Sequence, residues 1–126
     1  HILIMSDLLW HPTKMHATFE SYVDFWRDMV SSIERDGKFI YNQNIPLLQD
    51  LADTVREDIT AVPYLPHPIV RTGDNIELET RYGRVPVTLS DEELLGDINA
   101  ARLACRHLGV NDKEFYAIFE CIFRNC

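Results

Sequence analysis

The stretch IVRTGDNIELETRYGRVPVTL, residues 69–89, decides the predicted fold class. Apolar and polar side chains alternate over 76–82 and again over 85–89, which is the period of two expected of half-buried strands. Gly83 supplies the turn between these runs. Pro86 cannot donate a backbone hydrogen bond, so we expect the last strand to lie at a sheet edge. The stretch therefore predicts a small antiparallel β-meander.

Two helices are predicted before the meander. Over residues 15–33, apolar residues recur at spacings of three and four, the stripe of an amphipathic helix. Thr13 is a candidate N-cap for this helix, and Asp36-Gly37 supplies its stop. A second helix is predicted over 44–59, with Asn44 as its cap and a proline in its first turn, where a missing N–H does no harm.

The remaining segments complete the predicted order of elements. A short strand over 38–41 is expected between the two helices, and the three prolines within 60–68 predict a stiff, non-helical connector. After the meander, we expect a helix over 90–108, capped by Ser90 with Glu93 and ended by Gly109. A last helix is expected over 111–126, with Asn111 and Glu114 as its cap. The buried stripe predicted for the first of these is Leu94, Ile98, Ala101, Cys105 and Leu108.

The predicted fold class is therefore α+β: two N-terminal helices, a small antiparallel β-meander, and a C-terminal two-helix hairpin. A chain of 126 residues, with 46% hydrophobic and 25% charged residues, is typical of one globular domain, here residues 1–126. Because His1 is not an initiator, we expect Met5 to be the native start and residues 1–4 to be added or upstream sequence.

Charge and segment composition narrow the classes of partner. The chain has 20 acidic and 12 basic residues, a net charge of −8, which disfavours binding to nucleic acid phosphates. No apolar run approaches the length of about 20 residues that spans a bilayer, so we expect no membrane association. The start has no basic leader, and the three cysteines cannot all pair within one chain. Free thiols in a reducing cytoplasm are therefore predicted.

Sequence motifs give little support for catalysis, a cofactor or a metal. Four of the five glycines fall at predicted turns or helix ends, which leaves none to build a phosphate-binding loop. No serine lies in a G-x-S-x-G nucleophile elbow. His11 and His16 are five residues apart, whereas a helical zinc pair needs a spacing of four. We expect no cofactor and no metal, and favour a protein that is not an enzyme.

The segment from Cys105 to Ile118 resembles a helix-turn-helix motif. A small residue at Cys105 and the turn at Gly109 stand at the motif's characteristic positions, and apolar residues occupy its core positions. The resemblance covers about 20 residues and implies DNA binding through the last helix. However, the exposed face predicted for that helix carries three acids and two bases, which phosphates would repel. A helix-turn-helix regulator is therefore the least favoured interpretation.

The last predicted helix carries apolar residues on more than one face. A helix that packs one side against a small domain needs an apolar stripe only a little wider than 100°. Two interpretations remain open: a helix wedged centrally in the core, or a helix that forms a homodimer or partner contact. The candidate interface residues are Phe115, Tyr116, Phe119, Ile122 and Phe123.

A second candidate site is an apolar pocket with polar edges near the proline-rich segment. Aromatic and histidine side chains line many small-molecule sites, and histidine can act as an acid or base near neutral pH. The candidate pocket residues are Trp10, His11, Trp26, Tyr41, Tyr64 and His67. A core role for these aromatic residues is the competing interpretation.

The leading functional hypothesis is a non-enzymatic, acidic protein that works by protein contact. We expect it to form a homodimer through the last helix and to bind a partner with a basic surface, since complementary charge speeds and orients association. An accessory, inhibitor or immunity-type protein of a phage or mobile element fits this description. The alternative is a small-molecule-binding protein or minor enzyme that uses the aromatic and histidine pocket.

Overall fold

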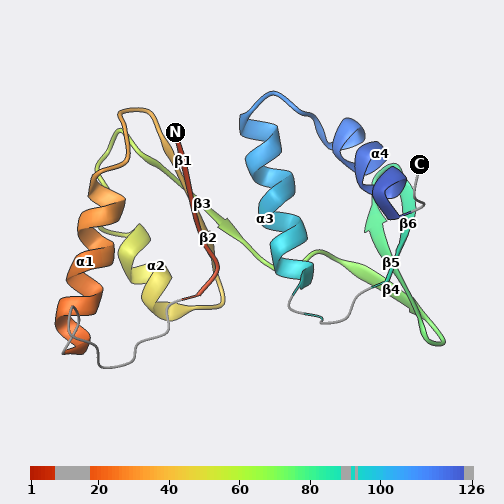
Figure 1. Ribbon diagram of the computed structural model, residues 1–126, viewed down its shortest axis with the longest axis horizontal. Coiled ribbons are helices and arrows are strands. Elements are labelled where there is room, and N and C mark those ends of the chain that lie inside the picture. The colour runs from red at the N-terminus through yellow and green to blue at the C-terminus, as the bar shows by residue number, and fades with distance from the viewer. Residues whose placement is uncertain (8–17, 89–91, 93, 124–126) are drawn as a thin grey trace. The chain divides into compact units, whose positions relative to one another are not determined.

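The computed structural model describes residues 1–7, 18–88, 92 and 94–123 (Figure 1). The elements follow the order β1, α1, β2, α2, β3, β4, β5, β6, α3, α4. Their contacts divide the chain into two compact units, residues 1–64 and 65–126, and each unit is described by itself. That residues 1–126 form one domain remains a prediction.

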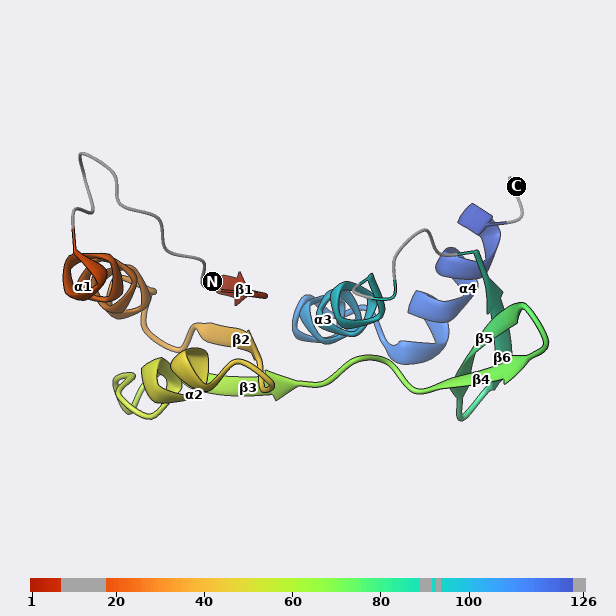
Figure 2. The same ribbon diagram turned by 90° about the horizontal axis from the view of Figure 1, so that it is seen from below.

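The first unit is a β-α-β-α-β arrangement around a three-stranded parallel sheet (Figures 1 and 2). The strands lie in the order β1-β2-β3, with Ile2 opposite Lys38 and Lys38 opposite Thr60 at the start of the register. The elements are β1 (Ile2–Met5), α1 (Phe19–Ser31), β2 (Lys38–Asn42), α2 (Pro46–Ala52) and β3 (Thr60–Tyr64).

One hydrophobic core holds this unit together. Side chains from α1 and α2 pack on the same face of the sheet, where Phe39 and Tyr41 of β2 stack with their ring centroids 5.4 Å apart. The buried members of the core are Met5, Val30, Phe39, Tyr41, Leu48, Leu51, Ala52 and Ile59. Removing this much apolar surface from water is the main favourable contribution to the unit's stability.

The parallel sheet contradicts the predicted order of elements, in which two helices came first. The strand expected over 38–41 is present as β2, but it pairs with β1 and β3, neither of which was expected. Residues 39–41 are all buried, as is typical of strands in parallel sheets. Such strands lack the alternation that indicates the meander, and three of the four residues of β1 fall within residues 1–4, which were expected to be added or upstream sequence.

The two helices of this unit are shorter than predicted. Helix α1 begins after Thr18, whose hydroxyl oxygen accepts a hydrogen bond from the Ser21 N–H at 3.1 Å. The expected cap, Thr13, lies outside the described residues. Helix α2 ends at Ala52, seven residues before the predicted end, and its N-cap position is Ile45 rather than Asn44. Residues 53–59 connect α2 to β3, so residues 60–64 are a strand within the predicted connector.

The second unit contains the predicted meander and the predicted helix pair. Strands β4 (Ile69–Thr72), β5 (Asn75–Thr80) and β6 (Gly83–Val87) form an antiparallel sheet in the order β4-β5-β6. This order confirms that the strand with Pro86 lies at an edge. Helices α3 (Leu94–His107) and α4 (Asp112–Phe123) follow the sheet. Leu78, Val85, Val87, Leu95 and Tyr116 are the buried core of the unit.

The predicted buried stripe of α3 is wrong at Leu94 and Leu108, although its member Ile98 packs partly buried against the core. Leu94 is 37% exposed and Leu108 is 73% exposed, whereas Leu95, Asn99, Ala100 and Leu103 are the buried residues of this helix. The buried face therefore includes a polar side chain, Asn99, which an apolar pattern cannot select. The cap predicted for this helix, Ser90 with Glu93, lies outside the described residues.

The cap predicted for α4, Asn111 with Glu114, is confirmed. The Glu114 N–H donates to the Asn111 side-chain oxygen at 2.9 Å, and the Asn111 N–H donates to the Glu114 carboxylate at 3.3 Å. These reciprocal bonds are a capping box, which satisfies N–H groups that have no partner within the helix.

Two further expectations concern thiols and membranes. Cys105 is a free, half-buried thiol, as predicted, whereas Cys121 is disulfide-bonded, so the free-thiol prediction is wrong at Cys121. No helix among the described residues combines the length and the apolar character that crossing a membrane requires.

Candidate functional site: the His67 pocket

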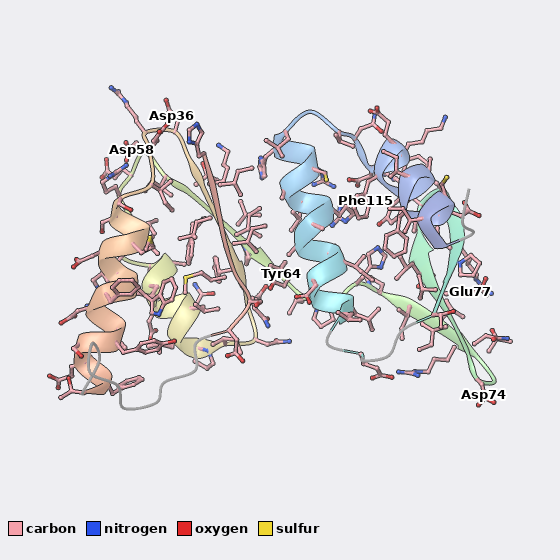
Figure 3. All side chains as sticks on the ribbon, viewed as in Figure 1. Asp36, Asp58, Tyr64, Asp74, Glu77 and Phe115 are labelled. Carbon is pink, nitrogen blue, oxygen red and sulfur yellow. The ribbon has the colours of Figure 1, made fainter. Side chains whose placement is uncertain are left out.

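The residues predicted to line one aromatic pocket do not converge. Trp26 and Tyr41 pack in the core of the first unit, where the Tyr41 hydroxyl donates to Gln49 at 3.1 Å. Tyr64 is buried at the end of β3, where it is labelled in Figure 3. Trp10 and His11 lie outside the described residues. The competing interpretation, a core role, holds for Trp26 and Tyr41.

His67 lies in a pocket of about 430 Å³ that belongs entirely to the second unit. Its walls come from the segment after β3, the end of β5 with the following turn, α3 and α4. The lining residues of this "His67 pocket" are Leu65, Pro66, His67, Pro68, Glu79, Thr80, Arg81, Asn99, Arg102, Asp112 and Tyr116. A pocket beside the proline-rich segment was expected, although most of its residues were not.

Two hydrogen bonds clamp the His67 ring, which is 3% exposed. Nδ1 lies 2.8 Å from the Pro68 carbonyl oxygen, which can only accept, so Nδ1 carries the proton. Nε2 then accepts from the Tyr116 hydroxyl at 2.6 Å. Burial is the main cause that lowers the pKa of His67, which agrees with a neutral ring. Burial raises the pKa of Tyr116, so its hydroxyl keeps the proton that it donates.

The backbone of the proline-rich segment is tied to α3. The His67 N–H donates to the Leu95 carbonyl oxygen at 3.0 Å, and the Asn99 amide donates to the Leu65 carbonyl oxygen at 2.7 Å. Pro66 and Pro68 have no N–H to satisfy. These bonds explain why a polar residue, Asn99, occupies the buried face of α3, and they fix one wall of the pocket.

The other polar wall joins α3 to α4. Arg102 donates through Nε to the Asn99 side-chain oxygen at 2.9 Å and through Nη1 to Asp112 Oδ2 at 3.0 Å. Arg106 donates to the same Asp112 oxygen at 2.7 Å. Burial alone would raise the pKa of Asp112, but the hydrogen bonds and charges of Arg106 and Arg102 outweigh it and lower the pKa. Asp112 is therefore ionised at neutral pH.

Two polar atoms of this network remain without partners among the described residues. Asp112 Oδ1 is buried and accepts no hydrogen bond. Nη2 of Arg102 donates to no acceptor, although the side chain is only 16% exposed. Asp112 Oδ1 is the buried polar atom of this network that lacks a partner, whereas Arg102 Nη2 is open to solvent and can be reached by a molecule in the pocket.

The predicted interface residues occupy different environments. Tyr116 is 8% exposed in the core, and Phe115, labelled in Figure 3, and Phe119 pack partly buried against that core. Ile122 is 64% exposed, and the side chain of Phe123 lies outside the described part of the structure. Tyr116 therefore fits the interpretation in which the last helix packs in the core, whereas Ile122 lies on an exposed face of that helix.

The exposure of the residues at core positions of the helix-turn-helix motif does not support that resemblance. Leu108 and Ile118 occupy positions that the motif places in its core, yet they are 73% and 57% exposed. The turn at Gly109, with a φ of 94°, is common to many helix ends that close on a glycine.

A second depression, of about 480 Å³, lies along β5 and β6 and includes Glu77, labelled in Figure 3. Its described lining holds two acidic residues, Glu77 and Glu120, and no cationic one. Among the described residues, no group of three or more His, Cys, Asp or Glu side chains is placed to hold a metal ion.

Sequence reasoning missed Asn99, Arg102 and Asp112. One signal was available: Leu95, Asn99 and Leu103 are spaced by four residues, so Asn99 lies in the middle of an apolar stripe. A polar residue there indicates a buried hydrogen-bonded group. This chain matches no protein-family model, and it has no significant match among curated proteins.

Proposed function

We propose that this chain binds a small polar molecule in the His67 pocket. The observation that carries the proposal is the guanidinium of Arg102, which Asn99 and Asp112 hold in place while Nη2 makes no hydrogen bond to another described residue, in a pocket of about 430 Å³. Pockets of this size commonly take small ligands, and a few fixed polar groups set the ligand's orientation.

Binding fits the geometry better than acid–base catalysis by His67. Both ring nitrogens are engaged, one by the Pro68 carbonyl and the other by the Tyr116 hydroxyl. A general base must reach the proton that it abstracts, directly or through one water. Because neither ring nitrogen is free to take a proton from a ligand, the His67–Tyr116 pair instead joins α4 to the proline-rich segment.

A ligand screen on the intact, ¹⁵N-labelled chain tests this proposal. Small polar compounds at millimolar concentration should include some that shift the backbone amide signals of Asn99, Arg102, Asp112 and Tyr116 in a saturable way. Arg102→Gln should abolish those shifts. The matched control is Arg27→Gln, because Arg27 pairs with Asp24 on exposed α1 in the other unit. A screen in which no compound moves the pocket signals would overturn the proposal.

A second candidate, protein contact through α4, has one specific observation in its favour. Ile118 and Ile122 are 57% and 64% exposed and lie one turn apart, so they share a face of the helix. Exposed apolar patches often mark protein interfaces. We propose a second copy of this chain as the occupant, while a partner with a basic surface remains the alternative from the net charge of −8.

Native mass spectrometry across protein concentrations tests this second candidate. A dimer is expected for the native chain and a monomer for the double variant Ile118→Glu, Ile122→Glu. Leu108→Glu is the control, since Leu108 is exposed but lies outside α4. A native chain that stays monomeric up to high micromolar concentration would contradict the homodimer.

A further inference from the structure

Arg102 is held ready to bind an anion. Its guanidinium donates to Asn99 of its own helix and to Asp112 of α4, and Asn99 is itself fixed by its bond to the Leu65 carbonyl. The plane of the guanidinium is therefore set from two directions before any ligand arrives. Its remaining nitrogen, Nη2, has no acceptor among the described residues. A planar guanidinium with its donors already oriented loses little freedom on binding an oxygen anion.

The charged residues that line the pocket balance one another, with Arg81 and Arg102 against Glu79 and Asp112. The one positive charge in excess comes from Arg106, which is half-exposed and lies outside the lining. Arg102 and Arg106 both donate to the single carboxylate of Asp112. His67 adds no charge at neutral pH, because burial lowers its pKa. A ligand with one negative charge neutralises this excess, whereas a dianion would leave an uncompensated charge in a partly buried site.

A cation does not suit this site. Asp112 Oδ2 already accepts from two arginines, which leaves one carboxylate oxygen, Oδ1, for a metal. Calcium takes six to eight oxygen ligands, and magnesium requires a near-octahedral set. Two guanidinium groups at the same carboxylate would also repel a divalent ion.

The rest of the pocket favours a ligand with a compact apolar body. Leu65, Pro66 and Pro68 form one wall, and the two prolines offer no backbone N–H. The ring of Tyr116 contributes further apolar surface. An anionic group at one end and an apolar body at the other match these surroundings.

We infer that the His67 pocket binds a small monocarboxylate, with its carboxylate on Arg102 and its apolar part against the proline-rich wall. This inference rests on the proposed function and names the ligand class of the same pocket. A carboxylate is chosen over phosphate because it carries one charge at neutral pH and presents the planar pair of oxygens that a guanidinium matches.

Benzoate and benzamide separate charge recognition from simple occupancy, because they share a shape and differ in charge. Titration of the intact ¹⁵N-labelled chain with benzoate should shift the Asn99, Arg102 and Tyr116 amide signals. Benzamide should bind at least about tenfold more weakly, a difference of about 1.4 kcal/mol. Inorganic phosphate at the same ionic strength should also bind more weakly than benzoate.

Variants of Arg102 show whether the preference depends on its guanidinium. Arg102→Gln should remove the preference for benzoate over benzamide, and Arg102→Lys should weaken benzoate binding because a lysine cannot reproduce the planar fork. Arg27→Gln should leave both affinities unchanged. Should Arg102→Gln fail to fold, Arg102→Lys and the comparison of the three probes on the native chain still decide the question.

Each outcome separates the inference from the proposed function. Equal binding of benzamide and benzoate at the pocket, or tighter binding of phosphate, overturns the monocarboxylate and leaves the small-molecule pocket standing. Benzoate binding that persists with its preference intact in Arg102→Gln also overturns the inference. A chain that binds none of the probes, and no compound of the wider screen, overturns both.

Discussion

The two hydrogen bonds of the His67 ring determine its protonation and its role in the pocket, and neither could be read from the sequence. The sequence predicted that His67 lines a pocket and could act as an acid or base near neutral pH. It does line a pocket, but both of its ring nitrogens are engaged in hydrogen bonds. The carbonyl oxygen beside Nδ1 selects the tautomer, and the tautomer makes Nε2 an acceptor. The Tyr116 hydroxyl then becomes the donor that joins α4 to the proline-rich segment.

The lowered pKa of His67 predicts a loss of stability in mild acid. Burial lowers the pKa from its usual 6.5 in the folded chain. As the pH falls through about 6.5, the unfolded chain takes up a proton that the folded chain does not, so the free energy of unfolding decreases. The slope from this one group is at most about 1.4 kcal/mol per pH unit, and it vanishes below the folded pKa.

Urea unfolding between pH 7 and pH 5 measures this effect. The native chain should lose more stability over this range than His67→Gln, which cannot titrate. Since the lowered pKa of Asp112 affects stability only in stronger acid, it does not disturb the comparison. Parallel curves for the two proteins would contradict a neutral, buried His67.

Among the elements, the capping box of α4 was read correctly from sequence, whereas the cap expected for α2, Asn44, was wrong. The Asn111–Glu114 capping box and the glycine after α3 involve residues three or fewer apart, so their partners are visible in the chain itself. The α3 face and the α2 end were wrong, because tertiary contacts decide which side is buried and where a helix stops. A polar residue such as Asn99 becomes favourable in a core only once Leu65 offers its carbonyl.

Removing one side of the capping box should weaken α4. Asn111→Ala leaves the Glu114 N–H without its acceptor, and loss of an N-cap typically costs about 1 kcal/mol. Chemical denaturation should show this decrease in the free energy of unfolding. Asn111→Ser is the control, because serine is also a good N-cap and should retain most of the stability.

Gly109 should resist substitution for backbone reasons alone. Its φ is 94°, and a Cβ at this position would meet nothing within 4 Å. Gly109→Ala should therefore lower the free energy of unfolding by about 1 kcal/mol through strain in the left-handed region. Gly109→Asn should cost less, since asparagine tolerates that region better. Equal stability of all three proteins would refute this explanation.

For the whole molecule, cooperativity of unfolding tests the prediction of one domain. Leu48 and Leu78 are fully buried in the cores of the first and second units. Each change to alanine should cost about 2–5 kcal/mol. If residues 1–126 form one domain, both variants should lower the same single calorimetric transition. Two transitions, each sensitive to only one variant, would show that the units unfold independently.

The sequence by itself determined the antiparallel meander, its edge strand with Pro86, and the caps of the last helix. Alternation, glycine turns and capping boxes act between near neighbours, so the chain displays them directly. Only the tertiary structure decided the parallel sheet, in which β1 pairs with β2 more than 30 residues away. The same holds for the His67 pocket, where His67 meets Tyr116 across 49 positions. Such pairings depend on which buried surfaces and hydrogen bonds fit together in space, and no local pattern records them.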